Sequence, residues 1–345
     1  MSTKKYNVAV VGANGAVGEE ILTILQEIDF PINKLVPLAS ARSVGKTVEF
    51  NAKELPIIEL TQDVFKEQEV EIALFSAGGS VSAEFAPHAV KAGAVVIDNT
   101  SHFRMDDNVP LVVPEVNPQD IAKWKKTGII ANPNCSTIQM VQTLKPLDDA
   151  YDLKRVDVAT YQATSGAGKS AMEELVTQMQ DFFAFKLDES EHKAFNQQIA
   201  LNVIPQIDVF MENDYTKEEM KMVNETIKIM HKNIPLSATC VRVPVLRGHS
   251  EALTLTFAKE VNANNARDLL SKAPNLVILD KPDEALYPMP CTCVDMNETF
   301  VGRIRNDTYS KNILHMFVVA DNLRVGAATN AVRIAQKWIE MEGEK

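Results

Sequence analysis

The chain has 345 residues, a length that favours two domains, and a formal net charge of −11. Its 46% hydrophobic and 23% charged residues are typical of a soluble globular protein and exclude wholesale disorder. The acidic balance argues against nucleic acid or an anionic membrane as the main partner, because both bind basic surfaces. No apolar run approaches the ~20 residues of a membrane span, and the first residues lack a signal-peptide pattern. With only four cysteines, a cytoplasmic protein is expected.

Short apolar strands alternate with helical segments in the first half of the chain. Strands are expected at residues 6–11, 34–38, 72–76, 94–97 and 128–131, and helices at residues 19–28, 82–92 and 117–124. Strands separated by helices imply a parallel sheet that is covered on both faces. The predicted fold class is α/β, with an N-terminal, Rossmann-like, doubly wound sheet built by right-handed crossovers.

Longer strands characterise the chain after about residue 133. They predict a second, α+β domain with a mixed or antiparallel sheet, and they are expected at residues 153–162, 237–245, 252–258 and 312–319. Residues 186–232 look helical and polar. The chain ends in an amphipathic helix over residues 326–341, whose apolar face includes Ala327, Ala331, Ile334, Trp338 and Met341.

A glycine-rich turn joins the first strand to the first helix. Gly12, Gly15 and Gly18 have the spacing G-x-x-G-x-x-G, a variant of the dinucleotide-binding fingerprint. Such glycines let backbone N–H groups approach a pyrophosphate at the positive end of the helix. The strand–turn–helix context is the one that the motif requires, so a dinucleotide site is favoured over a tight turn without a ligand.

The end of the second strand indicates which dinucleotide binds. NAD-binding proteins place an Asp or Glu there, about 20 residues after the glycines, for the ribose hydroxyls. This segment instead offers hydroxyls and cations without a carboxylate: Ser40, Arg42, Ser43 and Lys46. That set suits a 2′-phosphate, so NADP is the predicted cofactor; the alternative is a solvated basic loop.

Cys135 is the strongest candidate nucleophile. It follows Asn134 and precedes a helix-like run over residues 138–147, which places it at or near a helix N-terminus. The helix dipole and the free N–H groups at that position favour thiolate over thiol and so activate the sulfur.

The other three cysteines have no such setting. Cys240, Cys291 and Cys293 lie in strand-like or irregular stretches, and cysteine is among the most buried residue types, so inert packing is expected. The Cys291-x-Cys293 pair has no second pair of metal ligands nearby, so no zinc site is expected.

Residues 163–170, A-T-S-G-A-G-K-S, resemble a phosphate-binding loop. They follow a strand and precede a predicted helix over residues 171–183, and residues 275–280 imitate an apolar strand that ends in a magnesium-binding Asp. An ATP-hydrolysing or kinase-like module is therefore a competing interpretation. It is disfavoured because the strict motif requires Gly at position 163 and the chain already has a dinucleotide motif.

Arg242 and His249 lie at opposite ends of a strand–loop segment. Arg242 would alternate out of the apolar face and could bind a carboxylate with two N–H groups. His249 follows Gly248 and is a candidate exposed acid or base; the alternative is a solvated loop histidine without a role.

Together these residues resemble the aspartate-semialdehyde dehydrogenase family, along almost the whole chain. The order and context of the motifs are more specific than any one of them. The motifs are G-A-N-G-A-V-G at residues 12–18, S-A-R-S-x-G-K at 40–46, N-P-N-C-S-T at 132–137, Y-Q-A-T-S-G-A-G at 161–168, E-E-M-K at 218–221 and C-V-R-V-x-x-x-R-x-H at 240–249.

The resemblance implies an NADP-dependent, phosphorylating aldehyde dehydrogenase. Such an enzyme reduces L-aspartyl 4-phosphate to L-aspartate 4-semialdehyde and phosphate, in lysine, threonine and methionine biosynthesis and, in bacteria, diaminopimelate biosynthesis. The family also implies an NADP-binding domain at residues 1–133 and 325–345 and a catalytic and dimerisation domain at residues 134–324. A homodimer is expected, with a tetramer as the alternative.

The resemblance assigns the catalytic roles to three side chains. Cys135 is the nucleophile, His249 the general acid/base, and Gln162 orients the thiol or the intermediate. The chemistry agrees with these residue types, because a thiolate displaces phosphate from an electrophilic acyl phosphate and forms a thioester. Reduction then gives a thiohemiacetal, and an imidazole can move the proton as that adduct collapses.

Further residues are assigned to the substrate and the cofactor by the same resemblance. Arg242 clamps the substrate α-carboxylate, and Glu218 binds its amino group, with the adjacent Glu219 as the alternative. The phosphate-binding set is Arg104, Asn134 and Lys221. The cofactor-binding set is Gly12, Asn14, Gly15, Ala16, Val17, Gly18, Ser40, Arg42, Ser43, Ser165, Gly166 and Asn322.

Three rival functions can be distinguished from this interpretation by the residues at and after the cysteine. An N-acetyl-glutamyl-phosphate reductase is expected to follow its cysteine with Tyr-Pro-Thr, and a glyceraldehyde-phosphate-type dehydrogenase with Thr-Thr-Asn. Here the cysteine is followed by Ser136-Thr137-Ile138. The third rival, a non-catalytic NADP-sensing protein, would have no need of a helix-capped cysteine with candidate partners.

Overall fold

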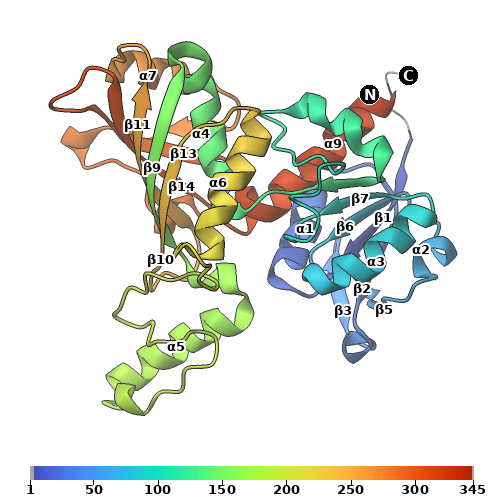
Figure 1. Ribbon diagram of the computed structural model, residues 1–345. Coiled ribbons are helices and arrows are strands. Elements are labelled where there is room, and N and C mark those ends of the chain that lie inside the picture. Colours follow the sequence, from blue (N-terminus) through green and yellow to red (C-terminus); the bar gives the residue numbers. More distant parts are fainter. Residues whose placement is uncertain (1–3, 344–345) are drawn as a thin grey trace. The chain divides into compact units, whose positions relative to one another are not determined.

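The computed structural model describes residues 4–343 and divides the chain into two compact units. The first unit ends at Asn134 and resumes at Ala327, and the second runs from Cys135 to Gly326. Each unit has its own sheet and its own hydrophobic core (Figure 1). Among the described residues, no helix is long and apolar enough to cross a membrane.

The first unit is built on a six-stranded parallel sheet with the order β5-β2-β1-β6-β7-β8. This confirms the predicted doubly wound sheet. The strands are β1 (Tyr6–Val11), β2 (Ile32–Ala39), β5 (Ile58–Glu59), β6 (Ile72–Phe75), β7 (Val95–Asp98) and β8 (Ile129–Ala131). A hairpin of β3 (Thr47–Phe50) and β4 (Lys53–Pro56) was not predicted from the sequence.

Helices cover both faces of this sheet, as a parallel sheet requires. Every residue of β6 and β7 is buried, because side chains on both faces pack against helices. The helices are α1 (Ala16–Glu27), α2 (Val64–Glu67), α3 (Gly79–Lys91), α9 (Thr329–Gly343) and the 3₁₀ helices η1 (Ala41–Ser43) and η2 (Pro118–Lys126).

The C-terminal helix α9 belongs to the core of the first unit. Trp338 packs edge-on against Tyr6 of β1, with ring centroids 6.2 Å apart, and against Trp124 of η2 at 5.6 Å. Ala331 and Ile334 are fully buried in the same core. The last helix therefore completes the unit that the first strand begins.

The second unit contains a six-stranded mixed sheet with the order β10-β9-β11-β14-β13-β12. The β9–β10 and β12–β13 pairs are parallel and the others are antiparallel, which confirms the predicted mixed sheet. The strands are β9 (Leu153–Gln162), β10 (Leu236–Arg242), β11 (His249–Phe257), β12 (Leu276–Ile278), β13 (Thr299–Asn306) and β14 (Ile313–Ala320).

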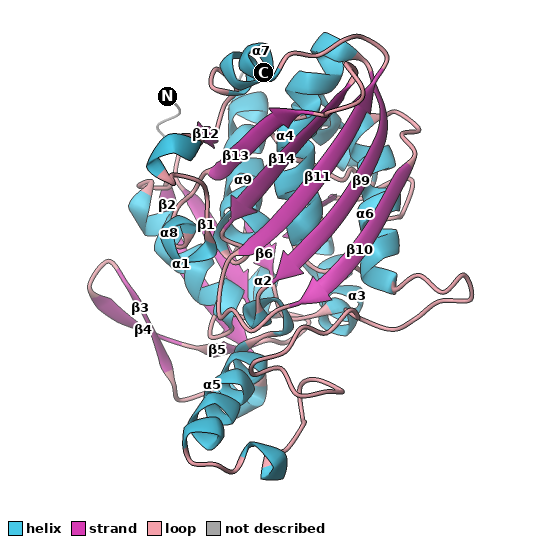
Figure 2. Ribbon diagram, turned by 90° about the vertical axis from the view of Figure 1, so that its left-hand side faces the viewer, coloured by secondary structure: helices cyan, strands magenta, loops and turns pink. Residues whose placement is uncertain are grey.

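Two long helices pack against one face of this mixed sheet. Figure 2 looks onto the open face of the sheet, with α4 (Cys135–Tyr151) and α6 (Lys217–Met230) behind it. The other helical elements are α5 (Lys169–Phe183), α7 (Ala263–Leu270), α8 (Pro290–Cys293), the 3₁₀ helices η3 (Thr164–Ala167), η4 (Leu187–Glu189) and η5 (Pro282–Glu284), and the π-helical turn η6 (Arg324–Ala328).

The expectation of a helical region over residues 186–232 is wrong for most of its length. Only η4 and α6 are helical there, and the chain between them is an extended loop (Figure 1). Pro205 interrupts any helix, and Leu201, Asp208 and Asp214 have left-handed backbone conformations that a right-handed helix excludes.

We expect Ile334→Ala to destabilise the first unit by about 2–5 kcal/mol, because it leaves a cavity in a closely packed core. Ile334 is fully buried on α9. Urea unfolding followed by tryptophan fluorescence measures the change, and Lys337→Ala on the exposed side of the same helix is the control. A wild-type unfolding midpoint in the Ile334 variant would contradict the placement of α9 in this core.

Candidate active site

Three predicted site residues meet at one edge of the mixed sheet because of strand direction. Gln162 ends β9 and Arg242 ends β10, and these residues are register partners in a parallel pair. His249 begins β11, which runs antiparallel to β9. The carboxyl ends of two strands and the amino end of a third therefore lie together, and they bring an amide, a guanidinium and an imidazole to the same edge.

Cys135 is the first residue of α4, as the sequence predicts, and its side chain is partly exposed. A 17-residue helix presents its first N–H groups and its positive dipole end to the sulfur, which favours the thiolate. Cys135 also interacts electrostatically with Arg242, whose positive charge favours the same form.

Gly326 lies against the backbone of Cys135. A Cβ atom added to Gly326 would stand 2.6 Å from the Cβ of Cys135, closer than real Cβ contacts allow. Gly326 lies within the π-helical turn η6, and single π turns are frequent at functional sites. Cys135 is therefore held in place by the start of α4 and by close contact with Gly326.

His249 is fully buried, so the expectation of an exposed loop histidine is wrong. It is the first residue of β11, and the sheet encloses it. Burial, with a smaller contribution from the charge of Arg242, lowers its pKa to about 3. The ring is therefore neutral at physiological pH.

The backbone of Ala163 selects the tautomer of that neutral ring. Its N–H donates to Nδ1 of His249 at 3.1 Å, so the proton of the neutral imidazole resides on Nε2. The carbonyl of Ala163 accepts a hydrogen bond of 2.6 Å from Nη1 of Arg242. The two backbone groups of one buried residue, Ala163, thus orient both the imidazole and the guanidinium.

Gly166 provides the space beside these two side chains. A Cβ atom at this position would lie 3.0 Å from Nη1 of Arg242 and 3.2 Å from Nε2 of His249. The buried Ser165 hydroxyl bonds the side chain of Asn322 at 3.0 Å, and Asn322 in turn accepts from the N–H of Gly248. Of the expected cofactor residues in this unit, Gly166 therefore lies beside the imidazole, and Ser165 and Asn322 hold the loop that precedes His249.

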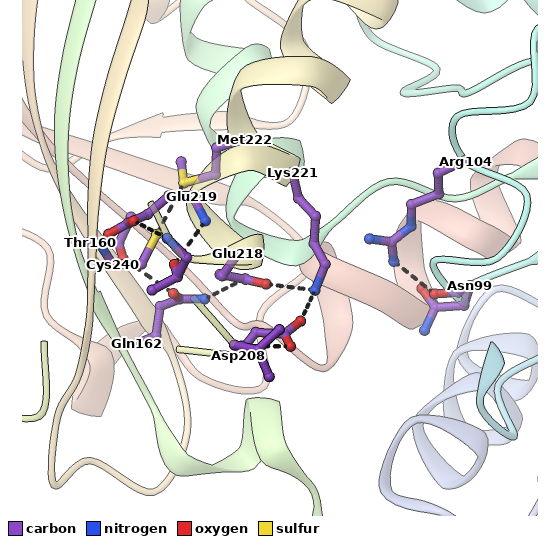
Figure 3. Close-up of polar contacts among 12 residues, drawn as sticks. Asn99, Arg104, Thr160, Gln162, Asp208, Glu218, Glu219, Lys221, Met222 and Cys240 are labelled. Carbon is purple, nitrogen blue, oxygen red and sulfur yellow. Dashed lines mark hydrogen bonds and ion pairs between the residues drawn. The ribbon is translucent and has the colours of Figure 1, made fainter. Parts of the chain in front are cut away.

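A chain of polar contacts leads away from Gln162 (Figure 3). The Nε2 of Gln162 donates to Glu218 at 3.1 Å, and the Nζ of Lys221 donates to Glu218 at 3.0 Å. Lys221 also bonds Asp208 at 2.9 Å. Burial lowers the pKa of Lys221, but the charges and hydrogen bonds of Glu218 and Asp208 outweigh it, and the pKa is raised.

The structure separates the two adjacent glutamates that the sequence left as alternatives. Glu219 completes the capping box of α6: its Oε2 accepts from the N–H of Thr216, and its Oε1 accepts from the N–H of Cys240. Glu218 instead directs its carboxylate to Gln162 and Lys221. Of the two, Glu218 has the contacts of a binding residue.

The glycine turn of the first unit opens α1 at the carboxyl edge of its sheet. Chain order reverses at β1, between β2 and β6, and ligands of doubly wound sheets bind at such a switch point. A Cβ atom at Gly18 would stand 2.1 Å from the carbonyl oxygen of Gly12, so only glycine allows this close turn. Gly15 is the N-cap residue, and Ala16, Val17 and Gly18 form the first helical turn.

The predicted 2′-phosphate segment lies next to this turn. The Nδ2 of Asn14 donates to the hydroxyl of Ser43 at 2.9 Å, which ties the loop after β2 to the glycine turn. Ser40 is the N-cap of η1, and Arg42 within η1 is exposed. The arrangement buries the hydroxyl residue Ser43 and exposes Ser40 and Arg42, which fits a phosphorylated ribose.

Arg104 and Asn134 are both buried in the first unit. Arg104 is held by the backbone: its Nε donates to the carbonyl of Asn132 and its Nη2 to that of Asn99, each at 2.9 Å (Figure 3). Asn134 directly precedes α4. These contacts keep a buried guanidinium in one orientation without neutralising its charge.

The sheet topology rejects the competing phosphate-loop interpretation. The motif does follow β9 and precede α5, but β12, which would supply the magnesium ligand, lies at the opposite edge of the sheet from β9 and β10. Asp280 after β12 instead pairs with Arg267 at 2.7 Å. Nothing in this order of strands brings that carboxylate to the loop.

Two of the remaining cysteines are packed as expected and one is not. Cys240 and Cys293 are buried, and burial raises the pKa of both thiols. Cys291 is exposed, which corrects the expectation of inert packing for that residue. Within residues 4–343, no group of three or more His, Cys, Asp or Glu side chains could hold a metal ion.

Three contributors to the site were missed from the sequence. Asp208 lies in the loop that was expected to be helical, and Gly326 was assigned to the start of a helix. Glu251 follows His249 by two residues on the same face of β11, a period-two signal that could have identified it. It is fully buried, and burial raises its pKa well above the ordinary value, although Gln139 opposes the shift.

Comparison with known proteins agrees with this architecture. Residues 7–124 match the semialdehyde dehydrogenase NAD-binding domain, and residues 144–325 match the semialdehyde dehydrogenase dimerisation domain. The two matches cover the two units described above and define a class of oxidoreductases.

Individual relatives specify the family within that class. Aspartate-semialdehyde dehydrogenase from Campylobacter jejuni is 65% identical over 99% of this chain and its whole length, and that from Aquifex aeolicus is 53% identical over 97% of this chain and 98% of its own. A crystal structure of aspartate semialdehyde dehydrogenase II complexed with ASA from Vibrio cholerae is 47% identical, with a TM-score of 0.94, and covers 98% of this chain and 99% of that one. This chain belongs to the aspartate-semialdehyde dehydrogenase family.

The buried carboxyl of Glu251 makes stability depend on pH. Its folded-state pKa is raised, whereas the unfolded side chain ionises at about 4.3. The contribution of Glu251 to the free energy of unfolding is therefore fully present below the unfolded-state pKa and is lost as the pH rises through the folded-state pKa. We expect Glu251→Gln, which is neutral at every pH, to gain melting temperature over the wild type between pH 5 and pH 8.

Differential scanning fluorimetry across that pH range measures the effect. Glu173→Gln, on the exposed side of α5 in the same unit, is the matched control and should show no such trend. A constant difference between Glu251→Gln and the wild type across the range would show that Glu251 is ionised in the folded protein.

Proposed function

We propose that the protein uses NADPH to reduce L-aspartyl 4-phosphate to L-aspartate 4-semialdehyde, with release of phosphate. The observation that carries the proposal is a partly exposed cysteine at a helix N-terminus in the same unit as a buried imidazole, amide and guanidinium at one sheet edge. The reaction serves lysine, threonine and methionine biosynthesis, and diaminopimelate biosynthesis in bacteria. The Vibrio relative, solved with ASA, supports this substrate class.

Cys135 is the nucleophile in this proposal. Its thiolate attacks the acyl carbon, the C–O bond to phosphate breaks, and a thioester forms on the sulfur. The helix N-terminus and the charge of Arg242 stabilise the thiolate before the attack and again when it leaves as the aldehyde forms. The amide of Gln162 orients the acyl group beside the sulfur.

His249 is the acid/base group, and its chemistry is set by Nε2. Because Ala163 occupies Nδ1, the neutral ring presents the Nε2 proton. That N–H group donates a hydrogen bond to the substrate oxygen and stabilises the negative charge that develops there. The proton is shared with that oxygen as the thiohemiacetal forms and collapses. A pKa of about 3 keeps the donor form populated throughout the physiological range.

The charged residues are proposed to hold the substrate. Arg242 binds the α-carboxylate with a guanidinium that Ala163 and the ring of Phe195, 5.9 Å away, keep in place. Glu218 binds the amino group. Arg104, Asn134 and Lys221 bind the phosphate, and their charges stabilise it as it leaves.

The glycine turn and η1 of the first unit fit NADP. Gly12, Gly15 and Gly18 form a close turn before the first N–H groups of α1, which have no partner within the helix. Asn14, Ser43 and the exposed Arg42 supply donors without a repelling carboxylate. When bound, NADPH supplies the hydride that reduces the thioester. The remaining proposed contacts to the cofactor come from Ala16, Val17, Ser40, Ser165, Gly166 and Asn322.

We further propose the domain roles and the assembly. The first unit binds NADP, and the second is catalytic and forms a homodimer. The match to a dimerisation domain and the open face of the mixed sheet in Figure 2 support the dimer. Tyr161 of β9 is exposed. Because all four cysteines are free thiols, a reducing cytoplasm is the proposed compartment.

The proposal predicts that Cys135→Ala abolishes turnover and that Lys169→Ala does not. The purified protein is given aspartate semialdehyde, phosphate and NADP, and NADPH absorbance is followed. The first variant removes the sulfur that must form the thioester, whereas Lys169 has a role only in a phosphate-loop ATPase. Phosphate-dependent turnover in Cys135→Ala would refute the thioester route.

Arg42→Ala should raise the KM for NADP about tenfold or more and leave the KM for NAD unchanged. The guanidinium is proposed to pair with a 2′-phosphate that NAD lacks, and such a charged contact is worth on the order of 1.5–3 kcal/mol. The same assay with each cofactor measures both constants, with Lys53→Ala on β4 as the control. An equal loss with NADP and NAD would place Arg42 outside the 2′-phosphate site.

A further inference from the structure

The single positive charge of Lys221 is paired with two carboxylates, those of Asp208 and Glu218. Its Nζ lies 2.9 Å from Asp208 and 3.0 Å from Glu218, and its side chain is about one-fifth exposed (Figure 3). The group of three therefore carries a net charge of −1 when all are ionised. A dianionic phosphate that approaches this group meets repulsion from both carboxylates as well as attraction from the ammonium.

Glu218 and Asp208 differ in how firmly the fold holds them. Glu218 is buried on α6 and also accepts from Gln162. Asp208 lies in a loop, and its side chain is about one-third exposed. The backbone of the loop is anchored, because the carbonyl of Val209 accepts from the N–H of Lys217. The exposed side chain of Asp208 can therefore leave Lys221 more readily than the buried Glu218 can.

Asp208 is also held in an uncommon backbone conformation. Its φ angle is +68°, in the left-handed region that costs non-glycine residues energy. The side chain offsets that cost, because Oδ1 accepts from the N–H of Val209 at 2.9 Å while Oδ2 accepts from Lys221. Loss of the ion pair would therefore leave the carboxylate of Asp208 with its bond to the N–H of Val209.

Asp208 lines the same hollow as Arg242, the proposed carboxylate clamp. A hollow of about 230 Å³ in the second unit is lined by Asp208, Arg242, Phe195 and neighbouring residues of the same loop. Asp208 therefore shares this hollow with the proposed carboxylate clamp, and it contacts the proposed phosphate ligand Lys221. A negative charge in this position acts on any anion that Lys221 binds.

We infer that Asp208 is a displaceable counterion that occupies Lys221 in the empty site and sets the affinity for phosphate. The inference rests on the proposed function, in which Lys221 binds the substrate phosphate. Phosphate replaces Asp208 on Lys221, and the substrate ammonium replaces Lys221 on Glu218. A free anion without an ammonium makes only the first exchange, so the arrangement favours the zwitterionic acyl phosphate over simple anions.

The test is Asp208→Asn, which removes the charge while it keeps the shape and a residue type that tolerates left-handed φ. In the oxidative direction, with aspartate semialdehyde and NADP saturating, the KM for inorganic phosphate should fall roughly 2- to 5-fold, the effect of one partly exposed charge. Asp214→Asn is the matched control, because Asp214 is exposed and also left-handed, with φ +63°, and it should leave that KM unchanged.

A second measurement separates this inference from the proposed function. Calorimetric titration of Asp208→Asn and Asp208→Gly with inorganic phosphate should show the same gain in affinity without turnover. An unchanged or weaker affinity, or an equal gain in Asp214→Asn, overturns the role of Asp208. If Lys221→Ala leaves the KM for phosphate unchanged, the assignment of Lys221 itself fails.

Discussion

The position of one sulfur atom constrains the rest of the second unit. Cys135 must begin α4 so that the first N–H groups of the helix face its thiolate. Gly326 must lack a side chain, because its Cα packs against the backbone of Cys135. The chain passes between the two units at these same residues, directly before Cys135 and directly after Gly326.

Burial shifts the pKa values of ionisable groups in this unit in different directions. His249 is fully buried and neutral, with its proton on Nε2, because burial lowers its pKa and Ala163 occupies Nδ1. Burial acts in the opposite direction on the carboxyl group of Glu251 and raises its pKa. Arg242 stays charged, because the pKa of a guanidinium is too high for burial to remove its proton. Arg242 and His249 therefore form a fixed pair of a cation and a neutral donor, which needs little reorganisation during a reaction.

Sequence reasoning located most of the secondary structure and the helix start at Cys135. Periodicity identifies β1 because nearly all of its residues are apolar and buried, and β9 because one of its faces is buried. It identifies α9 from the apolar stripe that packs into the core. It fails over residues 186–232, where Pro205 and left-handed residues such as Asp208 produce a loop whose composition resembles that of a helix. The burial of His249 depends on the pairing of β11 between β9 and β14, which the local sequence does not encode.

The most direct test of the account is the reaction without phosphate. When the enzyme is mixed with excess aspartate semialdehyde and NADP, hydride transfer can proceed but the thioester cannot be released. We expect a rapid burst of one NADPH per active site and, by peptide mass spectrometry, an aspartyl adduct on the peptide that contains Cys135, removable by hydroxylamine. Sustained turnover without phosphate and no adduct, or an adduct on another residue, would contradict the account.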